Sequence, residues 1–126
     1  MNDPLEETLK SALLRDAPRV IPNIRLFIRA RGVAKMASGN TVSFGLDGQC
    51  DLTAYVRDSG GVSIEIELKK STGRLRPDQE VWRAFCLAWG IPWILLKGGK
   101  GETIEQTMTR WFVELTPLVN AATRNP

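Results

Sequence analysis

The chain of 126 residues contains no histidine. This absence excludes a Ser-His-Asp triad, a Cys-His nucleophile pair and any zinc site with histidine ligands. Proton transfer near neutral pH would fall to a carboxylate, a lysine, a tyrosine, a cysteine or a metal-bound water. Any catalytic site in this sequence must therefore be built without imidazole.

Cysteine and long apolar runs are also scarce. The two cysteines, Cys50 and Cys86, do not form a C-x-x-C pair, and each lies in an apolar or strand-like context, so we expect both to be buried and free. No signal-peptide pattern and no apolar run of the ~20 residues that a membrane span needs is present. We expect a cytoplasmic protein without disulfides, folded as a single domain over residues 1–126.

Positive charge is unevenly distributed, although the net charge is only +3. No acidic residue falls between Asp16 and Asp47, and that interval holds Arg19, Arg25, Arg29, Arg31 and Lys35. A second basic cluster consists of Lys69, Lys70, Arg74 and Arg76. Such a stripe suits a polyanion, and a solvated charged face is the alternative.

Hydrophobic periodicity predicts the element order α-β-β-β-α-β-α, a mixed sheet flanked by helices and thus an α/β or α+β fold. The expected strands are residues 24–30, 50–57, 62–69 and 91–96. The expected helices are residues 4–15, ended by Pro18, and two more that begin at Pro77 and Thr103, the last ended by Pro117. We expect a mobile loop over residues 32–41, where basic and small residues dominate.

The pattern Glu67-Leu68-Lys69 is the main chemical feature of the sequence. The turn at residues 58–61 folds the strand over 62–69 back along its predecessor, which brings Asp51 close to Glu67 and Lys69. Converging carboxylates form a hard oxygen site for Mg²⁺ or Mn²⁺, to which the Leu68 carbonyl could add a ligand. Lys69 would hold a water or stabilise developing negative charge. The alternative is that Glu65, Glu67 and Lys69 form the wet side of the sheet.

Gln79 lies three residues before Trp82, on the inward stripe of the helix that begins at Pro77. Burying an amide without a partner costs ~1–3 kcal/mol, so we expect a hydrogen-bond partner near the Lys69 end of the preceding strand. The alternative is a partly exposed side chain with water as its partner.

Three stretches together resemble the virus-type replication-repair nuclease (VRR-NUC) family of the PD-(D/E)xK superfamily. They are residues 44–51 (FGLDGQCD), 64–69 (IEIELK) and 73–79 (GRLRPDQ). The resemblance implies the restriction-endonuclease-like core of that superfamily. It assigns Asp51 and Glu67 as metal ligands, Lys69 as the catalytic lysine and Gln79 as the motif glutamine.

The resemblance also implies a glutamate from the first helix at the metal, and Glu6 suits this better than Glu7 because it lies nearer the apolar stripe. Cys50 stands where the superfamily name has proline, and we expect Glu65, which the motif does not use, to face solvent. The implied activity is Mg²⁺- or Mn²⁺-dependent DNA endonuclease, structure-selective on branched DNA like a Holliday junction resolvase, in DNA repair or recombination. A flap- or nick-directed nuclease, a non-catalytic DNA-binding module and a structural or partner-binding protein are the alternatives.

Contacts with the DNA backbone are expected from the basic segments. The expected residues are Arg29, Arg31, Lys35, Lys70, Arg74 and Arg76. We also expect a homodimer, because free-standing relatives of this size resemble dimeric resolvases and symmetric cutting of two strands needs a two-fold pair. Trp111 or Phe112 of the last helix would supply the dimer contact.

Overall fold

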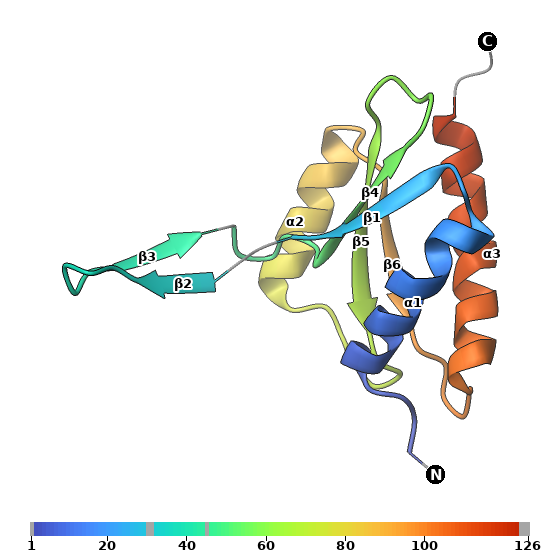
Figure 1. Cartoon of the computed structure of the whole chain (residues 1–126), viewed down its shortest axis with the longest axis horizontal. Helices are drawn as coiled ribbons and strands as arrows, with labels where there is room; N and C mark the ends of the chain where they lie inside the picture. The colour runs from blue at the N-terminus through green and yellow to red at the C-terminus, as the bar shows by residue number, and fades with distance from the viewer. Residues whose placement is uncertain (1, 30–31, 45, 124–126) are drawn as a thin grey trace.

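The computed structural model describes residues 2–29, 32–44 and 46–123, with the backbone alone described at 32–34 and 42–44. This part of the chain forms a mixed α+β fold of a four-stranded sheet, three helices and a separate two-stranded hairpin (Figure 1). The elements are α1 (Glu6–Val20), β1 (Ile24–Ile28), β2 (Gly32–Lys35), β3 (Thr41–Phe44), β4 (Leu52–Val56), β5 (Ser63–Lys69), α2 (Pro77–Ala88), β6 (Trp93–Lys97) and α3 (Ile104–Ala122).

The main sheet has the strand order β1-β4-β5-β6. Strands β1, β4 and β5 are antiparallel neighbours, and β6 runs parallel to β5 after the α2 crossover. The expected antiparallel pairing of the two strands around residues 58–61 is confirmed, with Leu52 opposite Ile66. The edge strand β6 is mostly half-buried, with Leu96 alone fully buried in it.

Helices α1 and α3 lie on one side of the sheet and α2 on the other (Figure 1). The core fills the α1–α3 side, where Ile64, Ile66 and Leu68 of β5 pack with Leu13 and Trp111. These residues alternate along β5, so every second side chain is directed to the opposite face. That opposite face carries the polar residues of β5, and α2 covers it.

Two prolines that were expected to end helices lie inside them. Helix α1 continues past Pro18 to Val20, and α3 continues past Pro117 to Ala122. A proline inside a helix costs ~3 kcal/mol because it removes one hydrogen bond and crowds the preceding turn. In α3, Leu115 and Val119 on either side of Pro117 are both buried, and their packing holds the two segments in one helix.

Residues 32–41, expected to be a mobile loop, instead belong to a hairpin of β2 and β3 that projects from the body (Figure 1). Its turn is closed by hydrogen bonds from the Met36 N–H to Asn40 O (2.6 Å) and from the Gly39 N–H to Met36 O (2.9 Å). Gly39 has φ +91°, which suits glycine at a tight turn. The loop prediction gave too little weight to the β-branched residues that flank the Ser-Gly-Asn sequence.

Trp111 and Phe112 do not form an exposed surface, so their expected role as a dimer contact is wrong. They are 0% and 8% exposed because the helical spacing with Leu115 turns them toward α1 and the sheet. The Trp111 indole N–H donates to the Lys97 carbonyl at 3.0 Å. As expected, Cys50 and Cys86 are both free and buried.

None of the helices in the described residues combines the length and hydrophobicity that a membrane crossing requires.

Candidate metal and catalytic site

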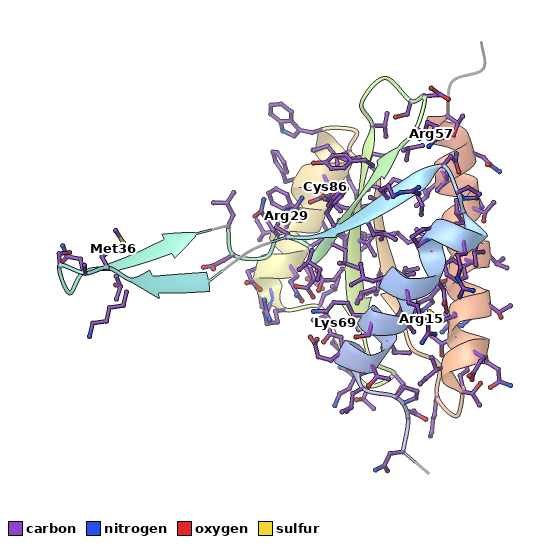
Figure 2. The ribbon with its side chains drawn as sticks, in the orientation of Figure 1. Arg15, Arg29, Met36, Arg57, Lys69 and Cys86 are labelled. Atoms are coloured by element: carbon purple, nitrogen blue, oxygen red, sulfur yellow. The ribbon has the colours of Figure 1, made fainter. Side chains whose placement is uncertain are left out.

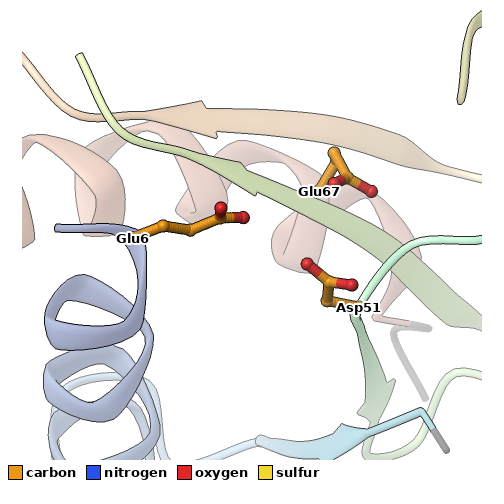
Figure 3. Close-up of side chains that lie close together, drawn as sticks. All are labelled: Glu6, Asp51 and Glu67. Carbon is orange, nitrogen blue, oxygen red and sulfur yellow. The ribbon is translucent and has the colours of Figure 1, made fainter. Parts of the chain in front are cut away.

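Three carboxylates from distant parts of the sequence meet at one end of the sheet. Glu6 comes from the first turn of α1, Asp51 from the residue before β4, and Glu67 from β5. One oxygen from each of the three groups lies within 4.8 Å of the others (Figure 3). The structure thus brings Asp51 and Glu67 together, as the sequence predicted, and places Glu6 with them.

The choice of Glu6 over Glu7 follows from where each side chain lies. Glu7 is exposed and forms an ion pair with Lys10, one turn along the helix, with Lys10 Nζ 3.0 Å from Glu7 Oε1. Glu6 is half-buried, and its pKa is raised first by desolvation and then by the nearby negative charge of Asp51. Two acids so close together repel each other, so the cluster favours a positive charge between them.

Glu67 is 1% exposed and has a defined hydrogen-bonding environment. The Gln79 amide Nε2 donates to Glu67 Oε1 at 3.0 Å, and Gln79 Oε1 accepts from the Arg76 backbone N–H at 2.9 Å. Gln79 is itself 3% exposed. This is the buried position and the partner near the end of the strand that the sequence predicted for Gln79.

Lys69 lies beside the carboxylates, with its Nζ 3.9 Å from Glu67 Oε1 and its side chain 11% exposed. Its aliphatic stem packs against Gly73, where an added Cβ would lie 3.1 Å from the Lys69 Cβ. This contact was not predicted from the sequence, although the turn residues Thr72-Gly73 after the strand were a signal for it. Leu68, between the two polar residues, is buried in the core, and metal binding by its carbonyl stays a prediction.

Gly48 also helps to position the site, and this role was not predicted from the sequence. It has φ +85°, and an added Cβ would overlap the Asp78 carbonyl in the first turn of α2. This close approach sets the segment that leads to Asp51 against the helix that carries Gln79. The Asp47-Gly48 pair, a common turn sequence, was the available signal.

The expectation that Glu65 faces solvent is wrong. Glu65 is 3% exposed and forms a bidentate ion pair with Arg29, at 2.6 and 2.7 Å. Its Oε1 also accepts from the Trp82 indole N–H at 3.1 Å. Because α2 covers this face of β5, Glu65, Glu67 and Lys69 do not form a wet side of the sheet.

The basic residues expected to contact DNA are placed in three different ways. Lys70, Arg74 and Arg76 are exposed in the segment between Lys69 and α2, and Arg76 also pairs with Asp78 at 3.2 Å. Lys35 is exposed on the projecting hairpin. The remaining two are Arg29, whose guanidinium is held by Glu65, and Arg31, which lies outside the described residues.

No protein-family model, curated protein or solved structure matches this chain. Membership of the VRR-NUC family therefore stays a prediction from the motifs. The geometry of Glu6, Asp51, Glu67 and Lys69 is the feature of the structure that points to a function.

Proposed function

We propose that the chain is a Mg²⁺- or Mn²⁺-dependent DNA endonuclease built on a PD-(D/E)xK core of the VRR-NUC type. The observation that carries this proposal is the convergence of Glu6, Asp51 and Glu67 beside Lys69. The three acids come from three separate elements, α1, the segment before β4, and β5, so local sequence patterning alone does not account for their meeting.

The donor set fits a hard divalent cation. Carboxylate oxygens are the protein ligands that Mg²⁺ and Mn²⁺ prefer, and soft ligands are not needed. Oxygens that share one octahedral Mg²⁺ lie at most about 4.2 Å apart, close to the 4.8 Å limit within which these three lie. Three carboxylates and the Lys69 ammonium leave a formal charge of −2 at the cluster, which one divalent cation would neutralise.

Each residue of the site has a distinct role in the proposed hydrolysis of a phosphodiester bond. Glu6, Asp51 and Glu67 would hold the cation, which supplies charge neutralisation at the phosphate and activates water for in-line attack. Lys69 places a fixed positive charge next to the reacting phosphate and stabilises the negative charge that develops there. Gln79 is a positioning residue, because its amide fixes the orientation of the Glu67 carboxylate.

The DNA backbone would approach along the segment after Lys69. Lys70, Arg74 and Arg76 are exposed there and are suited to phosphate contacts. Selectivity for branched DNA, of the Holliday junction type, and a role in repair or recombination follow from the motif resemblance and are part of the proposal. So is a homodimer, since one site per chain must act on two strands.

The test is a cleavage assay on four-way junctions, flaps and linear duplex, with Mg²⁺ and Mn²⁺ titrated separately. Asp51→Asn and Lys69→Met should lower the cleavage rate at least 100-fold, in the range of lost electrostatic catalysis. Both variants should bind DNA with the affinity of the wild type.

Glu6→Gln and Glu7→Gln form a matched pair, because each removes one negative charge from the first turn of α1. Glu6→Gln should weaken Mn²⁺ binding in calorimetry, and Glu7→Gln should not. Equal effects would show that Glu6 is not a ligand. A wild-type protein that binds DNA but never cuts it with either metal would be a non-catalytic binding module.

A further inference from the structure

Two aromatic side chains are in contact on the part of the sheet that α2 leaves uncovered. Phe27 of β1 and Tyr55 of β4 are 51% and 54% exposed, with ring centroids 5.4 Å apart. The register pairs Phe27 with Thr53 and Thr53 with Glu65 in one cross-strand row. Residues in one row share a face, so the aromatic pair lies on the face where α2 contacts Glu65.

A cavity of about 190 Å³ opens beside this pair. In the described part of the chain its lining contains Arg25, Tyr55 and Arg57 and no carboxylate, and the other lining residues are Pro22, Asn23, Ile24 and Val56. Arg25 Nη1 donates to the carbonyls of Pro22 (3.2 Å) and Ile24 (2.7 Å). Backbone oxygens therefore hold this guanidinium in place, and no acid among the described residues pairs with it.

The charge of the face is complementary to a polyanion. Arg25 and Arg57 line the cavity, and the Glu65 carboxylate, which shares a cross-strand row with Phe27 and Thr53, is already neutralised by Arg29. A two-fold contact with a second copy would set these arginines against themselves, which disfavours that occupant. Exposed aromatic rings with flanking arginines are the means by which proteins bind unpaired bases and their phosphates.

The face also connects to the carboxylate cluster. Asp51 immediately precedes β4, and Arg57 immediately follows it. Six residues of extended strand span about 20 Å. Figure 2 accordingly shows Arg57 and Lys69 at opposite ends of the sheet. A strand of nucleic acid lying along β4 would reach from the cavity to the cluster.

We propose that the Phe27–Tyr55 pair and the cavity between Arg25 and Arg57 bind unpaired nucleotides of single-stranded DNA, with a base stacked on the rings and a phosphate at the guanidinium groups. This site deepens the proposed function, because it names DNA with a single-stranded segment next to the cleavage point as the substrate class.

The experiment measures binding alone, by fluorescence anisotropy of a labelled oligothymidylate of about 15 nucleotides, a length within the site sizes of known single-strand binders. EDTA is present, so that neither metal nor cleavage contributes. Phe27→Ala and Tyr55→Ala should each raise the Kd about tenfold through lost stacking. Tyr55→Phe keeps the ring and should bind within about twofold of wild type, which separates stacking from loss of fold.

Matched controls remove similar groups elsewhere. Trp89→Ala removes a 74% exposed ring from the end of α2, and Arg15→Ala removes an exposed arginine from α1. Both should bind within about twofold of wild type. Arg57→Ala should reduce the slope of log Kd against log salt concentration by about 0.7, which is the value for one phosphate contact on a single strand.

Each of the following would overturn the proposal: no binding by the wild type, an equal loss of affinity in Phe27→Ala and Trp89→Ala, or a dimer that Phe27→Ala converts to monomer in sedimentation. The third would assign the face to a second copy. Single-strand binding with the expected variant pattern but without cleavage in Mg²⁺ or Mn²⁺ supports this site and contradicts only the proposed nuclease. Cleavage of flaps that is unchanged in Phe27→Ala contradicts this site and leaves the nuclease standing.

Discussion

Removing the guanidinium of Arg29 should destabilise the protein more than removing any exposed arginine. Arg29 and Glu65 form a bidentate pair in which the side chains are 21% and 4% exposed. Arg29→Ala would leave the Glu65 carboxylate buried, with the Trp82 N–H as its remaining partner among these contacts. Breaking a buried pair in this way costs about 3–5 kcal/mol of folding free energy. Because Arg29 is partly exposed, we expect the free energy of unfolding to fall by ~3 kcal/mol, at the lower end of this range.

This loss is large enough to measure by thermal unfolding. An unfolding entropy of about 2.1 cal/mol/K per residue gives about 260 cal/mol/K for the chain, so ~3 kcal/mol corresponds to a fall in Tm of about 11 °C. Arg76→Ala is the matched control, because its pair with Asp78 is exposed and contributes about 0–1 kcal/mol. The double variant Arg29→Met/Glu65→Leu should recover much of the stability, since an apolar pair of similar volume needs no charge compensation.

Thermal melts followed by circular dichroism would compare the Tm values of the wild type, Arg29→Ala, Arg76→Ala and the double variant. Equal falls in Tm for Arg29→Ala and Arg76→Ala would show that Arg29 does not hold β1 against β5 and α2. A fall in DNA affinity in Arg29→Ala without a fall in Tm would return Arg29 to its sequence-predicted role as a phosphate contact.

Three further predictions concern other parts of the molecule. Gly48→Ala should lower Tm more than Gly39→Ala, since both sites have positive φ but only Gly48 has no room for a Cβ; equal losses would refute the close approach to α2. Burial raises the pKa of the Cys50 thiol, so Ellman's reagent at pH 8 should label it only after unfolding, and rapid labelling of native protein would contradict this. A hydrogen bond from Arg110 lowers the pKa of the Glu102 carboxyl, so the stabilisation from this pair is present above the unfolded pKa of about 4.3 and is lost as pH falls through the lower folded pKa. The difference in Tm between wild type and Glu102→Gln should therefore be full at pH 7 and shrink as the pH is lowered below about 4.

The sequence predicted the parts of the fold that depend on local periodicity. The alternation along residues 62–69 placed Leu68 in the core and Glu67 on the opposite face, and the turn before it gave the antiparallel pairing with β4. The position of Gln79, three residues before Trp82, predicted a buried amide with a partner near the end of β5. In each case the determining contacts lie within one element or between neighbours in the chain.

The errors arose where packing between distant segments outweighs local preference. Pro117 is a helix breaker by itself, but the burial of Leu115 and Val119 keeps α3 continuous. In the alternation along β5, Glu65 falls on the polar side, where solvent exposure would be expected. It is buried because α2, which follows later in the chain, covers that side. Glu6 was placed through a motif resemblance, because no local pattern links it to residues 51 and 67.

The β2–β3 hairpin is an insertion between two strands that are already neighbours. The hairpin lies between Ile28, the last residue of β1, and Leu52, the first residue of β4. These two residues are register partners in the main sheet. Such an insertion adds reach without altering strand order, and lengthening a surface excursion costs only about 0.6 kcal/mol for each doubling of its length. The hairpin can therefore change in length and sequence while the four-stranded sheet stays the same, and such changes should cost the fold little stability.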